Sequence, residues 1–188
     1  LWFQRITEAR EQFNFVVNAD PQNGRGYLGL AETFFDEGNW NAAVRQAQQA
    51  LAQAGPSFQA LSLIGRAAKL LRDTNLAKES LDMAEKMLEQ SIDSSPDQPE
   101  SYYFRGEVCF AREQFSAALD HYRAAEHRAD PKKLYSSFGE TFGIADILAK
   151  QGLSYQRLGQ NDRARELGRR ILKMQPDHRL GKSLYEVE

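Results

Sequence analysis

The chain has 188 residues, of which 41% are apolar and 27% are charged, and its formal net charge is −2. This composition is typical of an ordinary globular protein, and the near-zero net charge argues against the strongly basic proteins that bind nucleic acid through phosphate contacts. Apolar runs stay shorter than the roughly 18 residues of a membrane span, so we expect no membrane insertion by this segment. The single cysteine, Cys109, excludes an internal disulfide.

Residues 1–22 predict an amphipathic helix. Ile6, Ala9, Phe13, Val16 and Val17 recur at the spacing of one helix face. The chain opens without a methionine, a basic n-region or a cleavage-site pattern. We therefore expect a segment of a larger protein.

A glycine motif follows this helix. Gly24, Gly26 and Gly29 spell G-x-G-x-x-G, the fingerprint of a dinucleotide-binding loop. That fold needs a strand before the glycines and an acid about 20 residues after them. Residues 13–17 continue a helix, and residues 45–55, RQAQQALAQAG, contain neither a β-branched run nor an acid. We predict no dinucleotide site and no cofactor, and we assign the glycines to a turn and to close helix packing.

An internal repeat explains these glycines. Ala31 and Gly65 lie 34 positions apart, and the same template returns at Gly106 and Gly152 after steps of 41 and 46 residues. The expected single array comprises a partial repeat helix at 1–22, repeats at 23–56, 57–97 and 98–131, an insert with a fourth repeat at 132–176, and a capping helix at 177–188.

The pattern resembles the tetratricopeptide repeat (TPR) family, whose units carry W-x2-L-G-x2-Y, then A-x3-F, then a proline. The residues that match are Tyr27, Leu30, Ala31, Phe34, Gly38, Trp40, Ala43 and Ala50 in one unit, and Leu148, Gly152, Tyr155, Gly159, Ala164 and Pro176 in the last. The resemblance covers nearly the whole chain. It implies an all-α fold, a right-handed TPR α-solenoid of antiparallel helix pairs.

Small residues are expected to let the two helices of each pair touch. The predicted contacts are Ala31 with Ala43, Gly65 with Ala77, Gly106 with Ala118, and Gly152 with Ala164. Two positions depart from the family pattern, because Arg105 and Gln151 stand where the family usually has leucine.

Two insertions interrupt the repeat. Extra residues after Ala84 predict a lengthened second helix in the repeat at 57–97. The insert at 131–143 contains Phe138 and Phe142 at helical spacing, but its glycines weaken a helix. We expect either an elongated helix or an ordered loop there.

The first helix of each unit lines the concave side in TPR arrays, so its exposed positions are candidates for a partner-binding groove. They combine apolar anchors, which supply burial, with charges that set register. The candidate groove residues are Arg25, Leu28, Glu32, Phe35, Arg66, Lys69, Tyr103, Glu107, Phe110 and Leu153. The alternative is that Tyr103 and Phe110 pack on the neighbouring unit.

Other chemistries fit the sequence poorly. The asparagines with which some TPR proteins grip a chaperone's C-terminal carboxylate are missing. His121, His127 and His178 lack the spacing of metal ligands, and we interpret them as solvated surface residues. Cys109 occupies a core position and is expected to be buried rather than nucleophilic. We therefore expect no metal site and no enzymatic activity.

The leading hypothesis is a non-catalytic protein–protein interaction module that binds a partner peptide or helix in the concave groove, as part of a larger protein or complex. The alternative is a homo-oligomerisation scaffold that assembles through the terminal helix, with Trp2 and Phe3, and through the 131–143 insert. Neither hypothesis includes a nucleic-acid partner. The composition leaves the bacterial cytoplasm and the periplasm both open.

Overall fold

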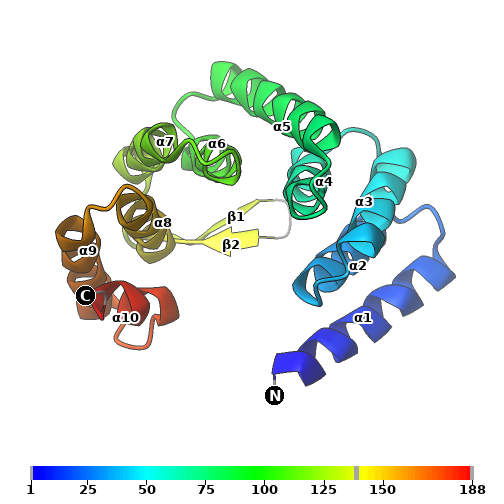
Figure 1. The fold of residues 1–188 in the computed structure, drawn as a ribbon, viewed down its shortest axis with the longest axis horizontal. Helices are drawn as coiled ribbons and strands as arrows, with labels where there is room; N and C mark the ends of the chain where they lie inside the picture. The colour runs from blue at the N-terminus through cyan, green and yellow to red at the C-terminus, as the bar shows by residue number, and fades with distance from the viewer. Residues whose placement is uncertain (1, 138–139, 187–188) are drawn as a thin grey trace. The chain divides into compact units, whose positions relative to one another are not determined.

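The computed structural model describes residues 2–137 and 140–186, with side chains for residues 5–136 and 141–186. These residues form ten α-helices and one β-hairpin (Figure 1). The chain consists of two compact units, Leu1–Met87 and Leu88–Glu188. Consecutive helices pack as antiparallel pairs within each unit, so the predicted all-α solenoid class is confirmed.

Unit 1 contains α1 (Trp2–Ala19), α2 (Gly24–Asp36), α3 (Trp40–Ala54), α4 (Phe58–Leu70) and the first part of α5 (Thr74–Ser94). Its core is rich in small residues: Ala31, Ala43 and Ala47 are completely buried. Larger side chains such as Tyr27 and Phe34 pack around them. Helix α5 has 21 residues against 15 in α3, so the second helix is longer in the repeat where extra residues were noted.

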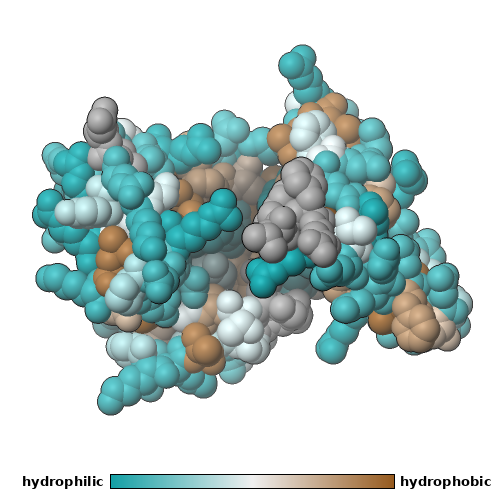
Figure 2. Space-filling view, turned by 90° about the horizontal axis from the view of Figure 1, so that it is seen from below, coloured by the Kyte–Doolittle hydropathy of each residue, from teal (hydrophilic) through white to brown (hydrophobic). Residues whose placement is uncertain are grey.

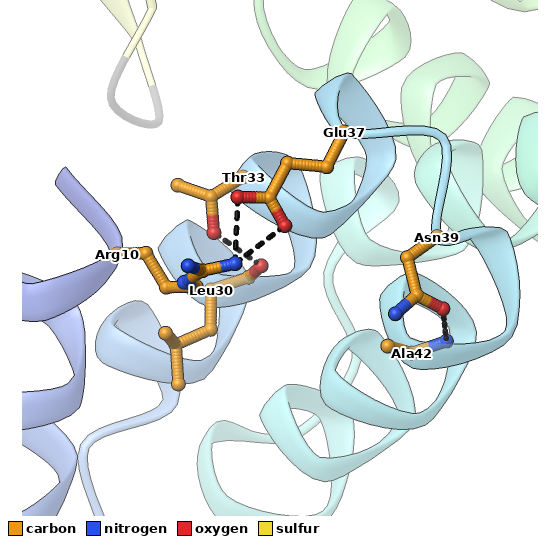
Figure 3. Close-up of polar contacts among 6 residues, drawn as sticks. All are labelled: Arg10, Leu30, Thr33, Glu37, Asn39 and Ala42. Atoms are coloured by element: carbon orange, nitrogen blue, oxygen red, sulfur yellow. Dashed lines mark hydrogen bonds and ion pairs between the residues drawn. The ribbon is translucent and has the colours of Figure 1, made fainter. Parts of the chain in front are cut away.

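Polar contacts fix the ends of the helices in unit 1 (Figure 3). The Nη1 atom of Arg10, on α1, donates to both carboxylate oxygens of Glu37 at 2.6 Å, which ties α1 to the C-terminal end of α2. The side chain of Asn39 caps α3 by accepting a hydrogen bond from the amide of Ala42 at 3.3 Å. Each contact satisfies a polar group at a point where one helix meets the next.

The glycines of the G-x-G-x-x-G motif lie at the start of α2, where α1 crosses close by. A Cβ atom at Gly26 would overlap Val17, and one at Gly29 would overlap the ring of Phe13. The side chain of Asn23 accepts from the amide of Gly26 at 2.9 Å and so caps the helix. The assignment of these glycines to a turn and to close packing is confirmed.

The turn between the two helices of each repeat places one residue in the left-handed region. These residues are Gly38, Arg72, Glu113 and Gly159, with φ between 62° and 79°. Their separations are 34, 41 and 46 positions, the same steps that the sequence repeat shows. Glycine adopts this conformation freely, whereas Arg72 and Glu113 do so at a cost of about 1–2 kcal/mol each. The repeat geometry therefore sets the turn even where the residue is unfavourable.

Unit 2 contains the end of α5, α6 (Pro99–Ala111), α7 (Phe115–Arg128), β1 (Tyr135–Ser137), β2 (Glu140–Phe142), α8 (Ile144–Arg157), α9 (Asn161–Met174) and α10 (Arg179–Tyr185). Leu148, Ala164, Ile171 and Leu184 are buried together between α8, α9 and α10. The short α10 thus covers the last helix pair, as expected of a capping helix.

The 131–143 insert forms a β-hairpin; of the two structures expected there, the elongated helix was wrong, and the ordered loop did not include strand pairing. The strands pair antiparallel with Tyr135 opposite Phe142. Both of these rings are buried, whereas Ser136, the residue after Tyr135 on β1, is exposed. Neighbouring side chains of the strand thus point to opposite faces, as in a β-strand. Phe138 and Gly139 lie outside the described residues. Strand pairing, rather than a helical turn, brings Tyr135 and Phe142 together.

At three of the four predicted small-residue contacts, the side chain nearest to the glycine is a large one. At Gly65 it is Leu81, one turn after Ala77 on α5. A Cβ atom at Gly106 would meet the ring of Tyr122, which lies one turn after Ala118 on α7. A Cβ atom at Gly152 would meet Leu184 on α10. In each place the glycine admits a large buried side chain, whereas the sequence suggested a small one.

Candidate interaction surface

We define the first-helix face of unit 1 as the candidate groove residues on α2 and α4: Arg25, Leu28, Glu32, Phe35, Arg66 and Lys69. The four charged residues are exposed, whereas Leu28 and Phe35 are half-buried and also pack on the core. The apolar residues therefore serve the core with one side and remain partly accessible on the other.

Phe35 and Arg66 meet on this face, although they belong to different repeats. The guanidinium carbon of Arg66 lies 4.5 Å from the centroid of the Phe35 ring. A cation over a ring face is attracted by the ring quadrupole, by about 0.5–1 kcal/mol where the pair is exposed. The arrangement offers a partner an apolar surface and a positive charge side by side.

The charges of this face are mixed, with an excess of cations among the candidate residues. Arg25, Arg66 and Lys69 are positive, and Glu32 is negative. Asp36, one residue after Phe35, reduces the excess. The balance favours a partner that carries carboxylates.

The first-helix face of unit 2, formed by Tyr103, Glu107, Phe110 and Leu153 on α6 and α8, is largely occupied by the chain itself. The hairpin lies against α6 and α8 (Figure 1), and the Phe142 ring stacks on Tyr103 with centroids 4.0 Å apart and planes 10° apart. Tyr103 is only 5% exposed and Phe142 2%. In this arrangement Tyr103 is covered by the insert.

Three rings surround Phe142. Besides the stack on Tyr103, the Phe104 ring packs edge-to-face with Phe142, with centroids 5.9 Å apart and planes at 85°. The Tyr135 ring stacks on Phe142 with centroids 5.7 Å apart and planes at 24°. We call Tyr103, Phe104, Tyr135 and Phe142 the aromatic cluster. Stacked and edge-on pairs contribute about 0.5–1.5 kcal/mol each beyond the area they bury.

Glu107 joins three helices through hydrogen bonds. The hydroxyl of Tyr122 donates to its Oε1 atom at 2.5 Å, and the ammonium of Lys150 donates to its Oε2 atom at 2.6 Å. Burial, and secondarily the negative charge of Glu107, raise the pKa of Tyr122 well above its ordinary value. Glu107 is thus a link between α6, α7 and α8, and its carboxylate is already paired.

Phe110 and Leu153 are half-buried in unit 2. The rings of Phe110 and Phe115 pack edge-to-face across the turn between α6 and α7, with centroids 5.1 Å apart. Leu153, on α8, packs against the core of unit 2. Both keep part of their surface accessible, so they are the apolar candidates on this face that the hairpin leaves available.

His178 departs from the surface interpretation of the histidines. Its side chain is 10% exposed, its Nδ1 atom accepts from the amide of Gly181 at 3.1 Å, and its Nε2 atom lies 3.3 Å from an oxygen of Asp146. A neutral imidazole satisfies both contacts, capping α10 and tying it to α8. Cys109 is buried, as predicted. The described residues contain no group of three potential metal ligands.

Sequence reasoning missed two residues that shape this unit. Phe142 belongs to the insert and not to a repeat position. Gln151, noted only as a departure, is 4% exposed and donates to Glu126 at 2.7 Å, which in turn pairs with Arg170 at 2.9 Å. The signal for the second was available, because a polar residue at a core position requires a buried partner.

The helices that the structure describes include none with the length and apolarity needed to cross a membrane.

Comparison with known families shows where the repeats match. A family described as tetratricopeptide repeat matches residues 3–57, 28–77 and 73–133. A second family with the same description matches residues 145–178. A search of curated proteins found no match.

Solved structures with a similar fold include three TPR-like examples. TTC0263, a thermophilic TPR protein of Thermus thermophilus, has a TM-score of 0.70 and 18% identity, with 98% of this chain and 92% of that one covered. The APC/C hetero-tetramer Cut9–Hcn1 has a TM-score of 0.63 and 23% identity, with 93% of this chain and 31% of that one covered. YrrB, described as a TPR protein with an unusual peptide-binding site, has a TM-score of 0.51 and 17% identity, with 98% and 85% covered. The chain thus spans about a third of the Cut9–Hcn1 chain that it matches.

Proposed function

The chain belongs to the tetratricopeptide repeat family, and from that premise we propose that it is a non-catalytic interaction module that binds a partner peptide or helix on its first-helix faces, within a larger protein or complex. The observation that carries the proposal is the contact between Phe35 and Arg66. It joins an accessible apolar ring to an exposed cation across two repeats, which is the combination that an anchored, charged ligand needs.

The partner that fits unit 1 is a segment with an apolar anchor and nearby carboxylates. The anchor would cover the accessible parts of Leu28 and Phe35, and the carboxylates would pair with Arg25, Arg66 or Lys69. Glu32 would then disfavour partners with the opposite charge order and so set direction. In unit 2, Phe110 and Leu153 are the accessible apolar candidates, and contact with Tyr103 would require the hairpin to move.

Selection of binders from a displayed random-peptide library tests this proposal without a known partner. We expect the selected peptides to be acidic and to contain an aromatic or large aliphatic residue. Phe35→Ala should weaken their binding by about 30-fold, the equivalent of about 2 kcal/mol. Arg66→Glu should weaken it mainly at low salt, because exposed charge pairs are screened.

Met83 provides the control, because it is an exposed apolar residue on α5, a second helix. Met83→Ala should leave peptide affinity unchanged. If Phe35→Ala binds the selected peptides as tightly as the native chain does, the first-helix face of unit 1 is not the binding surface.

Self-association is the second candidate, and exposed apolar side chains favour it. Phe15 on α1 is 75% exposed beside Glu8 and Glu11, and Leu134 at the base of the hairpin is 66% exposed. The visible face in Figure 2 shows apolar residues in separate small patches among hydrophilic ones. The side chains of Trp2 and Phe3, the other residues assigned to such an interface, lie outside the described residues.

Light scattering separates the two candidates. A stable dimer that Phe15→Asp or Leu134→Asp converts to a monomer would favour self-association. A monomer at all concentrations, together with peptide binding that depends on Phe35, would favour the first-helix face.

A further inference from the structure

We propose that the hairpin is a ligand in cis: the Phe142 ring fills an aromatic-binding site on α6 and can leave it, so that an aromatic side chain of a partner competes for the same place. The last step, competition by a partner, rests on the proposed function. The site and its occupation by the hairpin do not.

The walls of the site are held in place by groups outside the hairpin. Tyr103 and Phe104 project from α6, and the Tyr122 ring from α7 lies 6.0 Å from Tyr103. Tyr122 is completely buried, is hydrogen-bonded to Glu107 and fits against Gly106. Because these contacts do not involve Phe142, the site should keep its shape when the ring leaves.

The hairpin, by contrast, depends on the site. Each strand has three residues, and an isolated two-stranded hairpin is marginal in water even when it is longer. The Tyr135 hydroxyl accepts from the amide of Asp130 at 2.7 Å, and the hydroxyls of Ser136 and Thr141 lie 3.0 Å apart, so these bonds stay within the insert. The Phe142 ring connects the hairpin to α6, where it meets Tyr103 and Phe104. Docking of Phe142 and folding of the hairpin are therefore coupled.

This coupling lowers the free energy needed to open the site. Undocking exposes Phe142 and Tyr135, but it also releases the conformational entropy of the segment between Asp130 and Gly143. Local openings of this kind lie at the low-stability end of the range found in native proteins. Helix α8 has its own cap after the hairpin, because the amide of Gly143 donates to a carboxylate oxygen of Asp146 at 2.8 Å.

The geometry also defines the competing group. Tyr103 offers a parallel face at 4.0 Å and Phe104 an edge, so the cavity suits a flat ring rather than a branched aliphatic chain. Because the hairpin presents Phe142 from an extended strand, a ring on an extended peptide segment is the chemistry that fits.

The test supplies the hairpin in trans. The probe is a labelled synthetic peptide of residues 131–144, PKKLYSSFGETFGI, and fluorescence anisotropy measures its binding. We expect the full chain carrying Phe142→Ala to bind the peptide at least 10-fold more tightly than the native chain, whose site is filled. Peptide in which Phe142 is replaced by alanine should lose this advantage, and so should a chain that also carries Tyr103→Ala.

Leu134→Ala is the matched control, because Leu134 is exposed on the same insert. A chain with this change should bind the peptide as weakly as the native chain does. Equal affinity of the native chain and the Phe142→Ala chain would overturn the proposal. The anisotropy experiment does not depend on the acidic peptides selected on unit 1. The further inference and the proposed function can therefore be overturned separately.

Hydrogen exchange of the native chain keeps the proposal testable if Phe142→Ala fails to fold. We expect the amides paired between β1 and β2 to exchange at least 10-fold faster than those in the middle of α6 and α8, because the hairpin opens alone. If the hairpin amides exchange only as fast as those of the two helices, the hairpin is an integral part of unit 2 and the proposal is wrong.

Discussion

Helices α2 and α6 carry corresponding residues in the same repeat register, but the two units treat them differently. Leu28 on α2 is half-buried and Glu32 is exposed. At the matching positions of α6, Tyr103 is stacked under Phe142, and Glu107 is hydrogen-bonded to Tyr122 and Lys150. The register of a repeat therefore determines which side of a helix a residue occupies. An insert elsewhere in the chain determines whether that side is open to a partner.

The cores of the two units should respond alike to a larger side chain. This substitution gives the largest expected effect on the free energy of unfolding. Ala43 in unit 1 and Ala118 in unit 2 are both completely buried. Ala43→Leu and Ala118→Leu should each lower the free energy of unfolding by about 1–3 kcal/mol, because the added side chain finds no space. Urea titration followed by circular dichroism measures this loss, and Ala52→Leu, at an exposed site on α3, should cost much less. Unequal effects at Ala43 and Ala118 would show that the two cores differ as well as the faces.

Two glycines sharpen the comparison of the units. A Cβ atom would overlap the Phe13 ring at Gly29 in unit 1 and the Tyr122 ring at Gly106 in unit 2. Phe13 is half-buried and can turn aside, whereas Tyr122 is completely buried and hydrogen-bonded to Glu107. Alanine gains about 1 kcal/mol of helix propensity at both sites.

Gly106→Ala should therefore cost up to about 2 kcal/mol net in the free energy of unfolding, from overpacking less the propensity gain. Gly29→Ala should change it by less than about 0.5 kcal/mol, because the cost of turning Phe13 aside offsets the propensity gain. The same urea titration measures both. If Gly29→Ala lowers the free energy of unfolding more than Gly106→Ala does, Phe13 cannot turn aside, and α1 is held on α2 more rigidly than the exposure of Phe13 implies.

The sequence predicted the features that recur in every repeat, and it did not predict the hairpin. The predicted steps of 34, 41 and 46 residues also separate the left-handed turn residues, including Arg72 and Glu113, which are poor residues for that conformation. These features were predictable because each recurs in every unit and is set by contacts between neighbouring helices. The hairpin occurs once, and three-residue strands have too little local preference to be distinguished from a helix by spacing.

The candidate site was predictable to the same extent. The register identified Phe35 and Arg66 as residues of one face, and the structure brings them into contact. It did not predict the burial of Tyr103, because the covering ring of Phe142 comes from 39 positions further along the chain. His178 was misassigned for a similar reason, since its contact with Asp146 becomes visible only when α10 lies on α8.

Alkaline pH should reduce the stability that the buried Tyr122 hydroxyl, bonded to Glu107, gives to unit 2. The pKa of Tyr122 is raised in the folded state, so the native chain holds this proton where the unfolded chain, with a pKa near 10, releases it. The stabilising contribution is complete below about pH 10 and is lost as the pH rises from there towards the folded-state pKa. With an unfolded pKa near 10, the native chain can lose up to about 1.4 kcal/mol through this group by pH 11.

Tyr122→Phe removes this titration. Urea titrations at pH 8 and pH 11 should show that the variant loses less stability than the native chain over this interval, by up to about 1.4 kcal/mol, because the two proteins differ only in this hydroxyl. Equal losses in the two proteins would mean that the hydroxyl of Tyr122 ionises in the folded state as easily as in the unfolded chain.

The smallest expected effects come from the helix caps. The cap of α2 in unit 1 is compared with the cap of α10 in unit 2. Asn23 caps α2 with an amide oxygen, and His178 caps α10 with a ring nitrogen. In urea titrations the lost cap should cost about 1 kcal/mol in Asn23→Ala and in His178→Ala, and His178→Ala should lose about 0.5 kcal/mol more with the Asp146 contact. His178→Asn should restore the cap and leave only the loss of the Asp146 contact at 3.3 Å, about 0.5 kcal/mol. If His178→Asn is as costly as His178→Ala, the contact with Asp146 holds α10 rather than the cap. Release of α10 would also uncover Gly152, where Leu184 fills the space between α8 and α10.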